Sequence, residues 1–236
     1  MQRYFAKEKI NQTMFLNPDD LYHITIVMRM KTGDLIEVVD QHLVYLCQLK
    51  VSEYQVDITI LELLPQINHS QIDITLVIPI LKEPKMDLIL QKSTELGVSK
   101  IMPTIMSRSI VKVDLKGDKK LDRWRRICKE ASEQSMRNDI PVVTEIKELK
   151  DLKDLAGIKI ICSTLEKANN IRLFLQNQPK YDKIIIVIGP EGGLSIKEEE
   201  LLIKMDFIPV SLGHRILRVE TVPMFILSIL NYEYME

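Results

Sequence analysis

The sequence is poor in the residues that build metal sites and covalent cross-links. Its 236 residues include only three cysteines, Cys47, Cys128 and Cys162, and four histidines. The cysteines are scattered and form no CxxC pair, which argues against a zinc site. Scattered reduced thiols are typical of a cytoplasmic protein, so we expect a cytoplasmic location and no metal.

Long apolar runs are missing as well. No stretch of about 18 apolar residues occurs, so we expect no membrane span. The N-terminal sequence MQRYFAKEKI lacks the apolar core of a signal peptide. With 46% hydrophobic and 28% charged residues, the composition is that of an ordinary globular chain of one or two domains. The net charge of −1 excludes a chain that is basic throughout, but it permits a local basic patch.

The first 68 residues have the pattern of a small β-barrel. Short runs of alternating hydrophobicity are separated by turns such as Lys31–Asp34. The expected strands are His23–Met30, Leu35–Val39, Leu43–Leu49 and Gln55–Leu64. A polar segment, Pro65–Gln71, then marks a change of pattern and predicts a domain boundary.

From residue 72 onward, apolar strands alternate with amphipathic helices. The expected strands are Ile72–Ile80, Val98–Met106, Ile158–Ser163, Ile184–Ile188 and Phe207–Leu212. The expected helices are Met86–Leu96, a long one from Asp118 to about Arg137 in which Trp124 is a core anchor, Asn169–Gln176, Ile196–Met205 and one from about Pro223. This alternation predicts an α/β domain with a mainly parallel sheet over residues 72–236.

Two buried strands near the C-terminus open into loops that contain glycine. Ile184–Ile188 ends in Gly189-Pro-Glu-Gly-Gly193, and Phe207–Leu212 ends in Gly213. The first loop is neither a P-loop nor a GxGxxG fingerprint. Ser195 is expected to cap the following helix, with Glu198 completing a capping box. Parallel sheets bind ligands at the carboxyl ends of their strands, so both loops are candidates for a small-molecule site.

Charge is concentrated in two places. Arg218 and Glu220 lie between an apolar strand and an apolar helix, and charges buried there need partners. They are either a functional pair, or structural charges that form an ion pair or lie at the start of the following helix. Arg108 to Arg137 contains ten basic and five acidic residues. That stretch is either a surface for a polyanion or a solvated helix face balanced by Asp122 and Glu130.

Taken together, these residues resemble a known family. The strongest marks are Gly189-Pro-Glu-Gly-Gly with Glu198 or Glu199 downstream, and Leu212-Gly213-x-Arg215-Ile-Leu-Arg-x-Glu-Thr221. Supporting marks are Gln91-Lys-x-Thr-Glu-Leu-Gly97, Ser107-Arg-Ser-Ile-Val-Lys112, Arg123-Trp-x-Arg-Ile and Ala131-x-Glu-Gln-Ser135. Over nearly its whole length the chain resembles the SPOUT methyltransferases, and within them the family that methylates N3 of a uridine in 16S ribosomal RNA. Two departures are Val222-Pro223 after the Glu-Thr pair and Met136 before Arg137.

The resemblance implies a SPOUT domain with a C-terminal trefoil knot at residues 72–236, preceded by a PUA-like, RNA-binding β-barrel at 1–68. It implies a bound S-adenosylmethionine. The residues that it assigns to cofactor binding are Thr164, Leu165, Glu166, Gly189, Pro190, Glu191, Gly192, Gly193, Ser211, Leu212, Gly213, Ile216, Leu217 and Arg218. It also implies a homodimer, for which the final apolar helix, Met224–Leu230, is the candidate interface.

Methylation at N3 of uridine requires the N3 proton to leave. Arg218 is the candidate catalytic residue that stabilises the resulting anion, and Glu220 is the candidate residue that orients it. Glu191 or a water is the proton acceptor, and the sequence does not decide between them. The residues expected to bind 16S ribosomal RNA in the small ribosomal subunit are Arg3, Arg29, Arg108, Lys112, Arg123, Arg126 and Arg137. The alternatives are a methyltransferase for another RNA (tRNA or large-subunit ribosomal RNA) and a non-catalytic RNA-binding relative.

Overall fold

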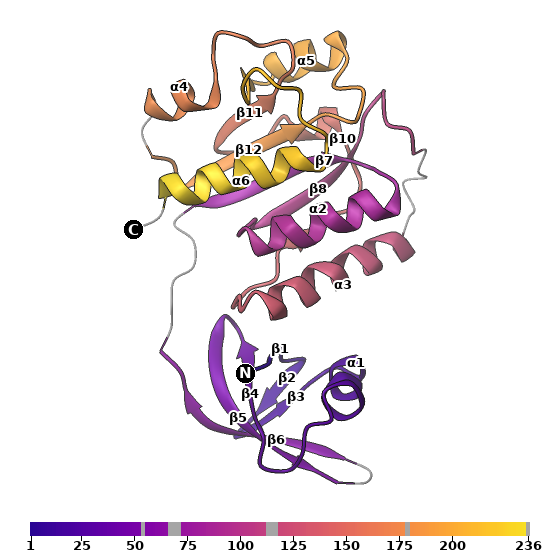
Figure 1. Ribbon diagram of the computed structural model, residues 1–236, viewed down its shortest axis with the longest axis vertical. Helices are drawn as coiled ribbons and strands as arrows, with labels where there is room; N and C mark the ends of the chain where they lie inside the picture. The colour runs from indigo at the N-terminus through magenta and orange to yellow at the C-terminus, as the bar shows by residue number, and fades with distance from the viewer. Residues whose placement is uncertain (53–54, 66–71, 112–117, 178–179, 235–236) are drawn as a thin grey trace. The chain divides into compact units, whose positions relative to one another are not determined.

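The computed structural model describes residues 1–52, 55–65, 72–111, 118–177 and 180–234 (Figure 1). The chain divides into two compact units. The first is Met1–Asn68 with Ser132–Asp139, and the second is His69–Ala131 with Ile140–Glu236. Within the described ranges, every helix is too short or too polar to cross a lipid bilayer.

The first unit is built on a six-stranded mixed sheet. Its elements are β1 (Arg3–Phe5), β2 (Glu8–Ile10), β3 (Thr13–Phe15), α1 (Pro18–Tyr22), the π-helical turn η1 (His23–Val27), β4 (Leu35–Asp40), β5 (Leu43–Val51) and β6 (Val56–Leu63). The strand order is β1-β4-β5-β6-β3-β2, and among the strand pairs that the structure describes only β1–β4 is parallel. Alternate residues of β4 and β5, among them Ile36, Val38, Cys47 and Leu49, fill the core.

The expected strand at His23–Met30 is wrong, because this segment continues the preceding helix. Pro18 lies in the first turn of α1, after Asn17, and α1 passes directly into η1. Only Ile24 of η1 is buried, whereas Ile26 and Val27 are exposed. A strand would have placed Ile24 and Ile26 on the same buried face, so the apolar alternation in this segment was misleading.

The second unit is an α/β fold whose described strand pairs are all parallel. Its strands are β7 (Asp73–Pro79), β8 (Lys100–Ile105), β9 (Val142–Val143), β10 (Lys147–Glu148), β11 (Ile158–Cys162), β12 (Lys183–Ile188) and β13 (Ile208–Val210). Its helices are α2 (Glu83–Glu95), α3 (Asp118–Gln134), which begins in this unit, the 3-10 turn η2 (Leu149–Leu152), α4 (Ile171–Gln176), α5 (Ile196–Ile203) and α6 (Thr221–Tyr234). The strand order is β10-β8-β7-β12-β11-β13, and β9 also pairs with β8. The prediction of a mainly parallel sheet is confirmed.

The central strands are apolar on both faces because both faces are covered. Ile184 and Ile186 of β12 pack in one cluster with residues of α2, α3, α4 and α6, including the predicted anchor Trp124. Ile185 and Val187 of β12 point the other way, into a cluster with η2 and α5. Continuous apolar runs such as Ile184–Ile188 are the sequence signature of a strand covered in this way.

Three neighbouring strands end at the same level of the sheet. Cys162, the last residue of β11, pairs with Ile188, the last residue of β12. It also pairs with Val210, the last residue of β13. The loops that follow these strands therefore start side by side at one edge of the sheet, where parallel sheets hold their ligands.

Candidate active site

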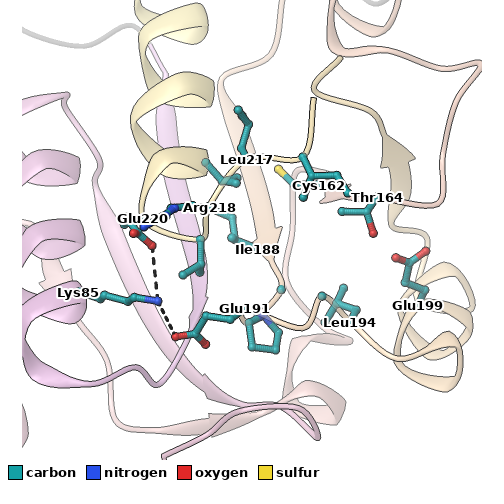
Figure 2. A pocket seen from close by; sticks show the side chains of 16 residues that line it. Lys85, Cys162, Thr164, Ile188, Glu191, Leu194, Glu199, Leu217, Arg218 and Glu220 are labelled. Carbon is teal, nitrogen blue, oxygen red and sulfur yellow. Dashed lines mark hydrogen bonds and ion pairs between the residues drawn. The ribbon is translucent and has the colours of Figure 1, made fainter. Parts of the chain in front are cut away.

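A cavity of about 280 Å³ lies where these strands end (Figure 2). Its lining comes from the ends of β11 and β12, the loops after β11, β12 and β13, and one residue each from α2, α5 and α6. The lining residues are Lys85, Cys162, Thr164, Ile188, Gly189, Pro190, Glu191, Gly193, Leu194, Glu199, Ile216, Leu217, Arg218, Val219, Glu220 and Val222. A smaller hollow of about 60 Å³ shares several of these residues and adds Ser211, Leu212 and Gly213.

The loop after β12 folds back tightly on itself. A Cβ atom at Gly189 would lie 2.8 Å from the backbone nitrogen of Leu194, closer than real side chains approach. Gly193 has a φ of +68°, which favours glycine, and its N–H donates to the carbonyl of Pro190 at 2.8 Å. Both glycines are therefore needed for the turn that forms this wall of the cavity.

The same loop is anchored to the start of α5. Ser195 Oγ accepts a hydrogen bond from the N–H of Glu198, and the Glu198 carboxylate accepts one from the N–H of Ser195, which confirms the predicted capping box. The Glu198 carboxylate also accepts from the N–H and hydroxyl of Ser107 at 2.6 and 2.8 Å. Burial on its own raises the pKa of Glu198, but these hydrogen bonds outweigh it and lower the pKa.

Arg108 supports the glycine loop from the neighbouring segment. Its Nη1 donates to the carbonyls of Gly192 and Leu194 at 2.8 and 3.2 Å. Arg108 is expected from sequence to bind RNA, and in the structure these two hydrogen bonds hold the cavity wall.

One end of the cavity carries three charged side chains from distant parts of the chain. Lys85 Nζ lies 2.9 Å from Glu191 Oε1 and 3.9 Å from Glu220 Oε2 (Figure 2). Burial tends to raise the pKa of Glu191, but Lys85 and backbone hydrogen bonds lower it overall. Glu220 Oε2 is buried and accepts no hydrogen bond from the residues that the structure describes.

Arg218 is exposed, so the expectation that it is buried is wrong. The next residue, Val219, is buried at 4% exposure and takes the inward position instead. The carbonyl of Arg218 accepts from the N–H groups of Thr221 and Val222 at 2.8 and 3.2 Å, where α6 begins. Among the described residues, no hydrogen bond or ion pair joins Arg218 to Glu220, whose described ion-pair partner is Lys85.

The opposite end of the cavity holds a buried carboxylate on α5. Glu199 is only 8% exposed, and both of its carboxylate oxygens lie near the hydroxyl of Ser163, at 3.0 and 3.1 Å. In Figure 2 Glu199 lies near Thr164, away from Lys85 and Glu220. Burial raises the pKa of Glu199, and the hydrogen bond from Ser163 only partly offsets this effect.

Most residues assigned to the cofactor from sequence do line these hollows. The large cavity contains Thr164, Gly189, Pro190, Glu191, Gly193, Ile216, Leu217 and Arg218, and the small hollow contains Ser211, Leu212 and Gly213. Leu165, Glu166 and Gly192 line neither. Leu165 is exposed, and the carboxylate of Glu166 accepts from the N–H groups of Ala168 and Asn169. These backbone hydrogen bonds lower the pKa of Glu166.

Sequence reasoning missed several lining residues. These are Lys85, Cys162, Ile188, Leu194, Glu199, Val219 and Val222. Cys162 and Ile188 are the last residues of β11 and β12, so the strand ends could have revealed them. Burial raises the pKa of Cys162 to about 12, so its thiol is neutral. Lys85 lies on α2, far from the C-terminal motifs in sequence, and carried no local signal.

The residues expected to bind RNA differ in how exposed they are and in whether they already form ion pairs. In the first unit, Arg29 is exposed, whereas Arg3 pairs with Glu37 at 2.6 Å and also donates to the carbonyl of Met136. Arg137 is buried at 8% exposure and pairs with Asp139 at 2.6 Å, which does not fit a phosphate-binding role.

Two further candidates lie on α3 in the second unit. Arg123 pairs with Asp87 at 2.6 Å through both of its terminal nitrogens. Arg126 is exposed and lies 3.7 Å from Glu130, so it is the freer of the two. Lys112 lies outside the described residues.

Comparison with known proteins gives consistent results over the chain. The family model for the RNA methyltransferase domain matches residues 68–231. Ribosomal RNA small subunit methyltransferase E of Bacillus subtilis (strain 168) is 35% identical, over 99% of this chain and 97% of that protein. The protein of the same name from Mesomycoplasma hyopneumoniae (strain 232) is 33% identical, over 97% of this chain and 98% of that protein.

A solved structure extends this similarity to the fold. The chain superposes on ribosomal RNA small subunit methyltransferase E from Neisseria gonorrhoeae, which was crystallised with S-adenosyl methionine, with a TM-score of 0.87. The two are 30% identical, and the match covers 99% of this chain and 98% of that one.

Proposed function

We propose, from the fact that this chain belongs to the ribosomal RNA small subunit methyltransferase E family, that it transfers a methyl group from S-adenosylmethionine to N3 of a uridine in 16S ribosomal RNA. The observation that carries the proposal is the cavity at the ends of β11, β12 and β13. It joins a glycine-rich wall to a cluster of charged side chains, and these are the two parts that such a transfer requires.

The cavity suits S-adenosylmethionine in size and chemistry. Volumes of about 280 and 60 Å³ together reach the lower end of the range for small-molecule sites, about 300–1,000 Å³. Apolar side chains such as Ile188, Leu194 and Leu217 offer surfaces to an adenine ring, and the glycine loop offers backbone polar groups. When bound, the cofactor supplies an electrophilic methyl group on a sulfonium centre.

The charged end of the cavity suits deprotonation of a uracil ring. N3 of uridine is a poor nucleophile while it carries its proton, so the site must stabilise the anion that forms. Arg218 lines the cavity, and its exposed guanidinium is a permanent cation with a fork of N–H donors that fits a uracil carbonyl oxygen. We assign anion stabilisation to Arg218.

Glu220 is a better candidate than Glu191 for accepting the N3 proton. The pKa of Glu191 is lowered, with Lys85 directly bonded to it, so Glu191 holds a proton weakly. Glu220 Oε2 is buried without a hydrogen-bond donor in the described part of the chain, which leaves it an unfilled acceptor position. In this assignment Lys85 holds both carboxylates in place, and Glu220 acts as a base rather than as the orienter of Arg218.

We propose that residues 1–68 are a PUA-like RNA-binding domain, a role that its six-stranded mixed sheet supports, and that residues 72–236 are a SPOUT domain with a C-terminal knot. We also propose a cytoplasmic homodimer that meets the small ribosomal subunit. Phe225 and Tyr232 of α6 are exposed and are candidate residues of the dimer interface. Light scattering of the purified protein would test whether it is a dimer.

Nucleoside mass spectrometry tests the reaction. Purified protein and S-adenosylmethionine are incubated separately with small subunits, large subunits and tRNA from a strain that lacks the gene. We expect 3-methyluridine in 16S ribosomal RNA of the small subunits only. Methylation confined to tRNA or large subunits would favour the other RNA substrates. If calorimetry showed no binding of S-adenosylmethionine, the chain would instead be a non-catalytic RNA-binding relative.

A further inference from the structure

Glu199 is a buried carboxylate that the proposed reaction does not use. It shares the inward side of α5 with Leu202, and both are buried. Unlike Leu202, Glu199 also lines the cavity. Figure 2 places it near Thr164, at the end away from Lys85, Glu191 and Glu220. A charged group at such a position is costly unless something pairs with it.

Helix capping does not account for Glu199. Acidic side chains in the first turn of a helix stabilise it, but Glu198 already fills that role through the capping box with Ser195. The Glu198 carboxylate accepts from two N–H groups and two hydroxyls, those of Ser107 and Ser195. The helix start is therefore complete without Glu199.

The described residues offer Glu199 fewer hydrogen-bond donors than its carboxylate can accept. Its described donor is the hydroxyl of Ser163, which lies within 3.1 Å of both carboxylate oxygens but has a single proton to give. The oxygen of Ser163 is itself occupied, because it accepts from the N–H groups of Leu165 and Glu166 at 3.0 and 3.2 Å. An ionised carboxylate has about four acceptor positions, so the described residues leave some of the acceptor positions of Glu199 unfilled beside the cavity.

The electrostatic surroundings agree with this deficit. Burial raises the pKa of Glu199, and the negative charge of Glu166 adds to the rise. Cys162, which also lines the cavity, is neutral because its pKa is about 12. Lys85, Glu191, Arg218 and Glu220 complete the charged lining. A carboxylate held at a raised pKa in a cavity is a candidate functional group.

We propose that Glu199 is part of the cofactor site and accepts, as a carboxylate, a hydrogen bond from a hydroxyl or ammonium group of bound S-adenosylmethionine. This inference rests on the proposed function, and it concerns the part of the cofactor away from Arg218. The cofactor donor fills a position that Ser163 cannot fill. Binding then favours the ionised form of Glu199, so a Glu199 that is protonated in the free protein releases its proton.

Isothermal titration calorimetry of the full-length protein tests this. S-adenosylmethionine is titrated from about pH 5 to about pH 8, a range above the ordinary pKa of a glutamate, so that proton release by a carboxyl group with a raised pKa can be followed. Two buffers of different ionisation enthalpy report the protons released. The variants are Glu199→Gln and, as a matched control, Glu200→Gln, which removes an exposed carboxylate from the same helix.

We expect the wild type to bind more tightly as the pH rises and to release a proton on binding at the acidic end. Glu199→Gln should bind about ten-fold more weakly or worse at pH 8, the scale of one hydrogen bond to a charged group, and should lose the proton release. Glu200→Gln should behave as the wild type. Equal affinity within about two-fold for Glu199→Gln, or unchanged proton release, would overturn the inference.

Two molecules related to the cofactor identify the group that donates to Glu199. S-adenosylhomocysteine carries both candidate donors, the ammonium group and the ribose hydroxyls. 5′-Methylthioadenosine has the ribose hydroxyls but no ammonium group. If Glu199→Gln weakens the binding of both molecules, the donor is a ribose hydroxyl. If it weakens only the binding of S-adenosylhomocysteine, the donor is the ammonium. Should Glu199→Gln fail to fold, the absence of proton release by the wild type overturns the inference. A wild type that does not bind S-adenosylmethionine at all contradicts the proposed function instead.

Discussion

Lys85 and Glu191 are 106 positions apart in the chain, yet their side chains meet at 2.9 Å. Lys85 comes from α2, and Glu191 comes from the glycine loop after β12. The contact joins a helix on one face of the sheet to the loop that forms the cavity wall. It also brings a cation close to Glu220, so three groups that the sequence separates form one cluster.

Replacing Lys85 tests whether this cluster serves the reaction. Lys85→Met should raise the pKa of Glu191, since Lys85 is one of the groups that lower it. We expect methyl transfer to fall about ten- to one-hundred-fold because Glu220 and Glu191 lose their shared cation. Rates measured against pH, with Lys204→Met as an exposed control, check this. A pH profile identical to that of the wild type would remove Lys85 from the mechanism.

Gly189 and Gly192 lie in the same loop but should differ sharply in how well they tolerate substitution by alanine. Gly189→Ala places a Cβ 2.8 Å from the backbone nitrogen of Leu194, so the loop must move. Gly192→Ala meets only the flexible side chain of Arg108, at 3.4 Å. We expect Gly189→Ala to weaken S-adenosylmethionine binding about ten-fold or more, whereas Gly192→Ala should bind nearly as the wild type. Calorimetry of the two variants compares them directly, and equal affinities would show that the tight turn is not required.

Arg218 should matter for the reaction but not for the fold. It is exposed and has no described hydrogen bond through its guanidinium, so Arg218→Ala should change the free energy of unfolding by less than about 0.5 kcal/mol. Cofactor affinity should stay largely intact while methylation is lost. Arg218→Lys keeps the charge but not the fork of donors, and should recover only part of the rate. Loss of cofactor affinity in proportion to activity would make Arg218 a binding residue.

Arg126 and Arg123 separate RNA binding from stability. Arg126 is exposed, so Arg126→Ala should weaken RNA binding and reduce the slope of log affinity against log salt by about 1. Arg123 forms a two-point ion pair with Asp87, so Arg123→Ala should mainly destabilise the protein. Binding of 16S ribosomal RNA at several salt concentrations and urea unfolding measure the two effects. A salt slope unchanged in Arg126→Ala would exclude this face of α3 from the RNA surface.

The sequence carried the parts of the fold that have strong local patterns. The apolar run Ile184–Ile188 predicted a buried parallel strand, and Ser195 with Glu198 predicted the start of α5. Both depend on residues that are neighbours in the chain. The segment His23–Met30 failed because its alternation is also compatible with a helical turn that buries Ile24 alone. The choice between them depends on packing, which no short window contains.

The candidate site shows the same division. The glycine loops could be found because glycine marks a turn wherever it occurs. Lys85 could not, because its role depends on where α2 lies in the fold. Arg218 was expected to be buried from its apolar neighbours, but Val219 occupies the inward position. Glu199 differs from Glu198 only by one step along a helix, and that step turns it from the capping box toward the cavity.

The shared level at which β11, β12 and β13 end has a consequence for how this protein can change over time. Main-chain pairing between Cys162, Ile188 and Val210 sets where the three strands end at the edge of the cavity, whatever side chains these residues carry. Substitutions around this edge therefore alter the chemistry of the cavity one position at a time. A single inserted or deleted residue within any of these strands would instead shift the loop after that strand relative to the loops after the other two. The lengths of β11, β12 and β13 should therefore be far more constrained than their composition.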